Sequence, residues 1–80
     1  MDSSDAFAIL KEILISEFEL EAGSIAPEKR LDHDLDLDSL DVADLLITLE
    51  DRINKKIDPT QFRDVRTVQD FVDRLVGSSE

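Results

Sequence analysis

A serine hydroxyl at the start of a helix is the group in this chain best placed to do chemistry. Asp38-Ser39-Leu40 precedes an amphipathic stretch, and aspartate is a favoured N-cap, so Ser39 is expected at the first helical position. A hydroxyl there lies beside unpaired backbone N–H groups and the positive end of the helix dipole. Such a position favours holding a phosphate group.

Nucleophilic or acid–base catalysis finds little support in the residue types. The chain has one histidine, His33, and neither cysteine nor tyrosine. His33 stands between Asp32 and Asp34, where a solvated loop histidine is a simpler interpretation than a hydrolytic dyad. Only carboxylates stand near Ser39 in the sequence as candidates for a general base. We therefore predict that the chain is not an enzyme.

The alternating acids before the serine raise the alternative of a calcium loop. The run is Asp32-x-Asp34-x-Asp36-x-Asp38, and an EF-hand loop also needs a glycine at its sixth position and a glutamate at its twelfth. Neither the register that starts at Asp32 nor the one that starts at Asp34 has those residues. No specific metal site is predicted. Loose binding of divalent cations stays open, because a cation would relieve the repulsion between these carboxylates.

The helix expected to begin at Ser39 has two apolar sides. With a period of 3.6 residues, one side forms the expected core face, made of Val42, Leu45, Leu46, Leu49 and Ile53. The opposite side carries Leu40, Ala43 and Ile47, with acidic residues among and beside them. Apolar groups ringed by acids suggest a docking surface for a basic partner. The alternative is that these are ordinary exposed apolar residues, which are common on proteins.

Three further segments have helical patterns. The first helix is expected to begin near Ser3 or Ser4, either of which can cap it. A long connection follows over residues 21–37, a short helix begins at Asp58, and the last helix begins at Thr67. We find no strand alternation and no repeat. The prediction is an all-α small bundle of three main helices plus one short helix, with a long loop between helices one and two.

Length and charge narrow the class of protein and its partners. Eighty residues suggest one small domain, residues 1–80. Lys and Arg number 9 against 20 Asp and Glu, and the formal net charge of −11 disfavours nucleic acid and anionic membranes as partners. No apolar run approaches the roughly 20 residues needed to span a bilayer. The first residues lack the basic and apolar regions of a signal peptide, so we expect a cytoplasmic protein. We also expect it to be a monomer.

Taken together, these residues resemble the acyl carrier proteins over nearly the whole chain. The likeness rests on the long loop, on Asp38-Ser39-Leu40, on Leu49-Glu50-Asp51 late in the central helix, and on Thr67-Val68-Gln69-Asp70 opening the last helix. The resemblance implies that Ser39 is esterified with 4′-phosphopantetheine taken from coenzyme A. The distal thiol of that group would hold acyl intermediates as thioesters for fatty-acid, lipid or polyketide biosynthesis.

The resemblance also implies partners and an acyl pocket. The expected partners are a phosphopantetheinyl transferase and acyl-transferring or acyl-modifying enzymes whose basic patches dock on the central helix. The residues implied for docking are Asp38, Leu40, Asp41, Asp44, Ile47, Glu50 and Asp51. In relatives that shelter the acyl chain the pocket lies between helices two and three. Its implied lining here is Leu31, Leu49, Ile57, Phe62 and Val65.

Two residues depart from the family pattern. Asp36 stands where many relatives have glycine, which adopts positive φ without steric cost, and Phe62 stands where many have a small residue. Both departures leave room for a specialised carrier rather than a housekeeping fatty-acid carrier. Two other interpretations remain beside the carrier. One is an acidic protein that binds divalent cations, and the other is a structural helical adaptor in which Ser39 is dispensable.

Overall fold

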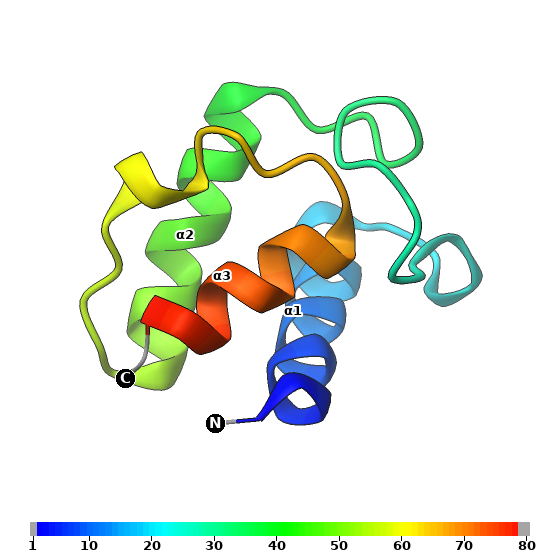
Figure 1. Ribbon diagram of the computed structural model, residues 1–80. Coiled ribbons are helices and arrows are strands. Elements are labelled where there is room, and N and C mark those ends of the chain that lie inside the picture. The colour runs from blue at the N-terminus through cyan, green and yellow to red at the C-terminus, as the bar shows by residue number, and fades with distance from the viewer. Residues whose placement is uncertain (1, 79–80) are drawn as a thin grey trace.

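The computed structural model describes residues 2–78, which form a small helical bundle (Figure 1). Its elements are α1 (Ser3–Phe18), the 3₁₀ helix η1 (Ala22–Ser24), α2 (Ser39–Ile53), the 3₁₀ helix η2 (Pro59–Phe62) and α3 (Val68–Ser78). Within residues 2–78, β-type pairing is limited to an isolated bridge between Arg30 and Thr67. The predicted all-α class is therefore confirmed, with three main helices and a short one, while η1 was not predicted.

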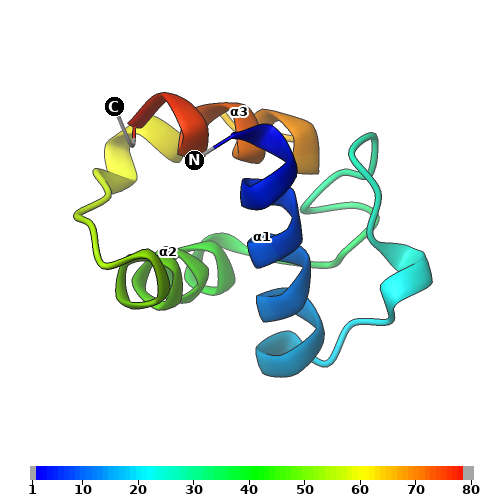
Figure 2. The same cartoon turned by 90° about the horizontal axis from the view of Figure 1, so that it is seen from below.

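The three long helices meet through α1. This helix packs against both α2 and α3, and η2 packs against α3. In Figure 2 α2 is viewed almost along its axis while α1 is seen from the side, so the two helices are inclined to each other. Both views put most of the connection between α1 and α2 on the opposite side of the molecule from η2. None of the described helices combines the length and the apolar character needed to cross a bilayer.

A single hydrophobic core joins these elements. The expected core face of α2 is confirmed, since Leu45, Leu46 and Leu49 are buried and Val42 and Ile53 pack against them. The other buried side chains come from α1, α3, η2 and the connections: Ala6, Leu10, Ile13, Leu14, Ile25, Leu31, Leu35, Leu37, Ile57, Phe62, Val68, Phe71, Val72 and Leu75. The ring centroids of Phe62 and Phe71 lie 4.8 Å apart, which holds η2 against α3.

Side-chain caps determine where the first and last helices begin. Asp2 caps α1, and its Oδ1 accepts the N–H of Asp5 at 2.9 Å. The expectation of a serine cap was wrong, because the aspartate one residue earlier already satisfies that N–H group. At the start of α3, Asp70 Oδ2 accepts the N–H of Thr67 at 3.2 Å, and Thr67 Oγ1 accepts the N–H of Asp70 at 3.1 Å. The predicted start of the last helix is confirmed.

Backbone hydrogen bonds tie the long connection to the start of α3. The N–H of Leu31 donates to the carbonyl of Arg66 at 2.9 Å, and the N–H of Val68 donates to the carbonyl of Lys29 at 2.9 Å. Further along the connection, Asp36 has a φ of 57°. This is the left-handed conformation that glycine adopts at no steric cost. Asp36 therefore adopts a backbone conformation for which glycine is better suited. This conformation directs the chain toward the start of α2.

Candidate functional site

Ser39 is the first residue of α2, and it is exposed. Asp38 caps the helix, because its Oδ1 accepts the N–H of Asp41 at 2.9 Å. Asp41 completes a capping box, since its Oδ2 accepts the N–H of Asp38 at 3.2 Å. The N–H groups of Ser39 and Leu40 have no acceptor inside the helix. The serine hydroxyl is thus accessible and lies beside free N–H groups at the positive end of the helix dipole.

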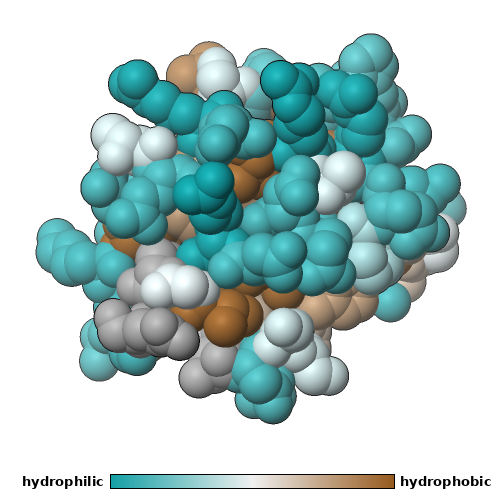
Figure 3. All heavy atoms as spheres, viewed as in Figure 1, coloured by the Kyte–Doolittle hydropathy of each residue, from teal (hydrophilic) through white to brown (hydrophobic). Residues whose placement is uncertain are grey.

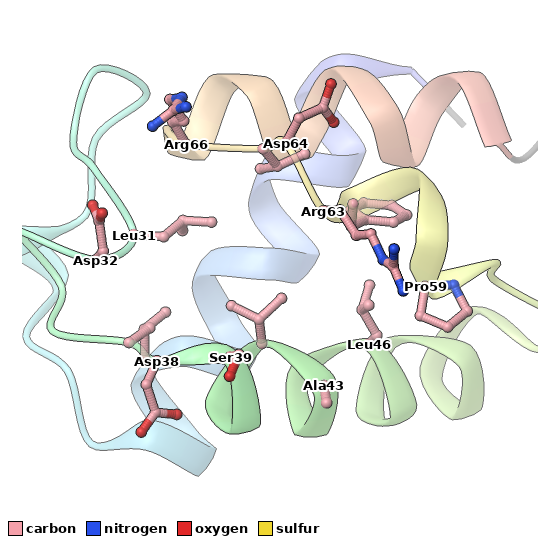
Figure 4. A pocket seen from close by; sticks show the side chains of 14 residues that line it. Leu31, Asp32, Asp38, Ser39, Ala43, Leu46, Pro59, Arg63, Asp64 and Arg66 are labelled. Atoms are coloured by element: carbon pink, nitrogen blue, oxygen red, sulfur yellow. The ribbon is translucent and has the colours of Figure 1, made fainter.

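A cavity of about 430 Å³ lies beside Ser39 (Figure 4). It is bounded by α2, by the connection that precedes α2, and by the segment that runs from η2 to the start of α3. Its apolar lining includes Leu31, Leu37, Val42, Leu46, Pro59, Phe62 and Val65. In Figure 4 Leu31 points from the connection into the space above α2. A group attached to Ser39 would therefore have an apolar space next to it.

The residues implied for an acyl pocket divide into two sets. Leu31, Phe62 and Val65 border this cavity. Leu49 and Ile57 are buried in the core and do not belong to its lining. Phe62 is itself buried and contributes to the wall rather than blocking the space beside Ser39.

Sequence reasoning did not assign Val42 and Leu46 to the cavity, although both line it. They follow Ser39 by three and seven residues, a spacing that puts all three on one side of a helix. That spacing was the signal that could have identified them. Arg63 also lines the cavity, and no sequence pattern indicated it, because its position depends on how the segment after η2 packs.

The outward side of α2 is an exposed surface. We define the outer α2 face as Leu40, Ala43, Asp44, Ile47 and Asp51, all of which are exposed. Leu40 is 74% exposed and Ile47 is 63% exposed, which is unusual for large apolar side chains. Figure 3 shows a mostly hydrophilic molecular face with isolated hydrophobic areas, one of them over the start of α2. The apolar residues and acids that suggested a docking surface therefore do reach solvent together.

Three of the acids implied for docking also hold the fold. Asp38 and Asp41 form the capping box described above. Glu50 is half-buried, and its Oε2 accepts the N–H of Ile57 at 2.7 Å, which ties the last turn of α2 to the segment that follows. Sequence spacing gave no sign of this bond, because it depends on the path of the chain after α2.

Asp32, the first acid of the run before Ser39, forms an ion pair with Arg30. The Arg30 guanidinium bonds to Asp32 at 3.2 Å, and this bond holds the pKa of Asp32 below its ordinary value. His33 is exposed, and its Nε2 lies 3.9 Å from Asp32 Oδ2. Among the described residues no three histidine or acidic side chains are grouped so that they could hold a metal ion.

Comparisons with known proteins identify the family. The family model for the phosphopantetheine attachment site matches residues 8–75. Acyl carrier protein 2 of Ralstonia nicotianae is 33% identical over 72 residues, which cover 90% of this chain and 89% of that protein. The acyl carrier protein of Myxococcus xanthus is 34% identical over 74 residues, which cover 92% of this chain and 94% of that protein.

A solved structure agrees with these sequence matches. The acyl carrier protein from Enterococcus faecalis has a TM-score of 0.73 at 24% sequence identity, over 98% of this chain and 99% of that chain. The match shows that the two chains share a fold. The family model, which covers most of the sequence, and the two relatives above confirm the resemblance and its cofactor, 4′-phosphopantetheine. The chain therefore belongs to the acyl carrier proteins, within the phosphopantetheine attachment-site family.

Proposed function

We propose that Ser39 is the residue to which 4′-phosphopantetheine is attached, and that residues 1–80 act as one carrier domain. The observation that carries this proposal is the exposed Ser39 hydroxyl at the first position of α2, next to an apolar cavity. The residues present fit the group. A phosphate on Ser39 would lie beside the free N–H groups of Ser39 and Leu40, where the helix dipole favours negative charge.

The surroundings of Ser39 also suit a reactive cargo. When bound, the pantetheine arm supplies a thiol that carries acyl groups as thioesters. The chain contains no cysteine, so no thiolate of its own competes for the acyl group. The cavity walls include Leu31, Val42 and Leu46, which are apolar. An acyl chain that filled the cavity would exclude water from these side chains.

We further propose that partner enzymes, and not this chain, catalyse the reactions of the cargo. The outer α2 face combines exposed Leu40 and Ile47 with the acids Asp44 and Asp51, which suits enzymes with basic patches around an apolar contact. Asp38, Asp41 and Glu50 add negative charge along the same helix. The partners would be a phosphopantetheinyl transferase and acyl-handling enzymes of fatty-acid, lipid or polyketide biosynthesis, acting on a cytoplasmic monomer.

Intact-protein mass spectrometry tests the attachment. The protein is incubated with coenzyme A, magnesium and a broad-specificity phosphopantetheinyl transferase, and one phosphopantetheine per chain is expected. Ser39→Ala should stay unmodified, while Ser16→Ala, a matched change at an exposed serine of α1, should be modified like the wild type. Circular dichroism should show the same helical content in all three proteins. A wild-type chain that stays unmodified while a control carrier is modified would contradict the proposal.

A further inference from the structure

The charged residues that line the cavity differ in how they are paired. All three lining carboxylates are already engaged. Asp32 bonds to Arg30 at 3.2 Å, Asp38 accepts the N–H of Asp41 at 2.9 Å, and Asp64 bonds to Arg74 at 3.2 Å. None of these carboxylates therefore depends on a cation inside the cavity.

Two arginines, Arg66 and Arg63, also line the cavity, and within residues 2–78 neither side chain makes a hydrogen bond or ion pair, although the chain has a net charge of −11. Arg63 is exposed. In Figure 4 its guanidinium points from the segment after η2 toward α2, on the side of Leu46 and Pro59. Arg66 lines the same cavity, but its guanidinium points away from α2 in that view. The five N–H donors of Arg63 are therefore directed toward the cavity with no acceptor from the protein.

Ser39 lies at one end of the cavity, and the Arg63 guanidinium lies near Leu46 at the other end. Leu46 follows Ser39 by seven residues, which corresponds to about 10 Å along the helix axis. Between these two ends the walls include the apolar side chains of Val42, Leu31 and Val65. A group that enters from the Ser39 end thus meets an apolar space first and a guanidinium at the far end.

We propose that this cavity selects acyl groups whose far end carries an acceptor oxygen, a carboxylate above all, which Arg63 binds. This inference rests on the proposed attachment at Ser39. Arginine presents planar N–H donors that match a carboxylate, and pairs of this kind are stronger than neutral hydrogen bonds. A purely hydrocarbon chain would fill the apolar part of the cavity and make no hydrogen bond to the exposed guanidinium.

Two cargoes of equal length test the proposal. The transferase is supplied with hexanoyl-coenzyme A or adipoyl-coenzyme A, and intact mass confirms that each acylated arm is attached before any further measurement. The adipoyl form should melt roughly 4 °C or more above the hexanoyl form. Its thioester should also hydrolyse more slowly, because the bound cargo is sheltered from water. Failure at the loading step would count against attachment at Ser39, whereas equal melting of two loaded forms would overturn only the cargo proposal.

Arginine variants identify the group that binds the carboxylate. In Arg63→Gln the order should reverse, because the adipoyl carboxylate then adds one more negative charge to an acidic protein. Arg66→Gln removes the same charge from an arginine that points away from α2, and it should keep the wild-type order. If the melting temperatures of the adipoyl and hexanoyl forms differ as much in Arg63→Gln as in the wild type, the proposal is overturned.

The arm's phosphate is the other possible source of an anion near Arg63. The unacylated holo form separates the two sources, because it carries the phosphate and no carboxylate. If Arg63→Gln removes a melting difference between the holo and apo proteins, Arg63 binds the arm and the cargo proposal fails. We expect that difference to be the same in wild type and in Arg63→Gln.

Discussion

Asp38 and Asp41 exchange hydrogen bonds across the first turn of α2, with Ser39 between them. Asp38 Oδ1 accepts the N–H of Asp41 at 2.9 Å, and Asp41 Oδ2 accepts the N–H of Asp38 at 3.2 Å. The two carboxylates therefore fix the backbone that presents the serine. They also put negative charge next to Ser39, where a basic partner can reach it.

This reciprocal pair gives the first prediction. Asp38→Ala and Asp41→Ala should each lower the free energy of unfolding by about 1 kcal/mol, the usual cost of losing a helix cap. Asp44→Ala is the matched control on the same helix, and it should change stability by about 0.5 kcal/mol or less, as exposed substitutions usually do. Denaturant melts measure all three. Wild-type midpoints for both cap variants would show that the box does not stabilise α2.

The second prediction concerns Asp36, whose backbone has the left-handed conformation three residues before Ser39. Asp36 has a φ of 57°. Asp36→Val should lower the free energy of unfolding by roughly 1–2 kcal/mol, because a β-branched side chain is strained in this conformation. Asp36→Gly should change it by less than about 1 kcal/mol, since relief of strain is offset by the greater freedom of glycine in the unfolded chain. Equal stabilities for the valine and glycine variants would contradict the strain argument.

Sequence periodicity predicted the helices well because their buried faces repeat within one element. Leu45, Leu46 and Leu49 are buried as the 3.6-residue period requires, and the Asp38 cap marked the start of α2. Both signals are local, so neither depends on how distant segments pack.

The details of the site depended on contacts between distant segments. Leu49 and Ile57, expected to line an acyl pocket, are buried outside the lining of the cavity beside Ser39, because the cavity wall is set by how the segment after η2 approaches α2. The bond from the Ile57 N–H to Glu50 joins residues seven positions apart through a loop. The direction of Arg63 likewise follows from that packing, and no spacing rule gives it.

Electrostatic docking on α2 is the third prediction. Asp44→Lys reverses one charge on the outer α2 face without removing a cap. It should melt like the wild type but lower kcat/KM for phosphopantetheine transfer several-fold at low salt, mainly through slower association. The loss should shrink as ionic strength rises. Glu17→Lys makes the same charge change at an exposed site of α1 and should leave the rate near that of the wild type.

A wild-type rate for Asp44→Lys at low salt would show that the outer α2 face is not the electrostatic docking surface. Asp41→Lys is the weaker choice for this experiment. The carboxylate of Asp41 bonds to the N–H of Asp38, so its loss would disturb the helix start together with the charge.

The fourth prediction is a pH dependence at the start of α3. The pKa of Asp70 is held below its ordinary value, chiefly because its carboxylate accepts the N–H of Thr67. A lowered folded-state pKa stabilises the fold fully above the unfolded value of about 3.9, and this stabilisation is lost as pH falls through the folded-state pKa. Asp70→Asn should therefore melt below the wild type at neutral pH, and the difference should diminish in acid.

Thermal melts from neutral pH down to about pH 3 measure the Asp70 effect. Asp44→Asn, a change at an exposed aspartate of α2, serves as the comparison. If the difference in melting temperature between wild type and Asp70→Asn stays constant over this pH range, the charge of the Asp70 carboxylate does not stabilise α3.

Peptide mapping of the modified protein tests the central claim most directly. Trypsin cleaves after Arg30 and Arg52 and at no position between them, and the resulting peptide has two hydroxyl side chains, Ser39 and Thr48. Thr48 Oγ1 donates to the carbonyl of Asp44 at 3.0 Å, whereas Ser39 is exposed at the helix start. Fragment ions should put one phosphopantetheine on Ser39. A modified protein in which this peptide is unchanged, or in which the group is on Thr48, would contradict the assignment of Ser39 as the attachment residue.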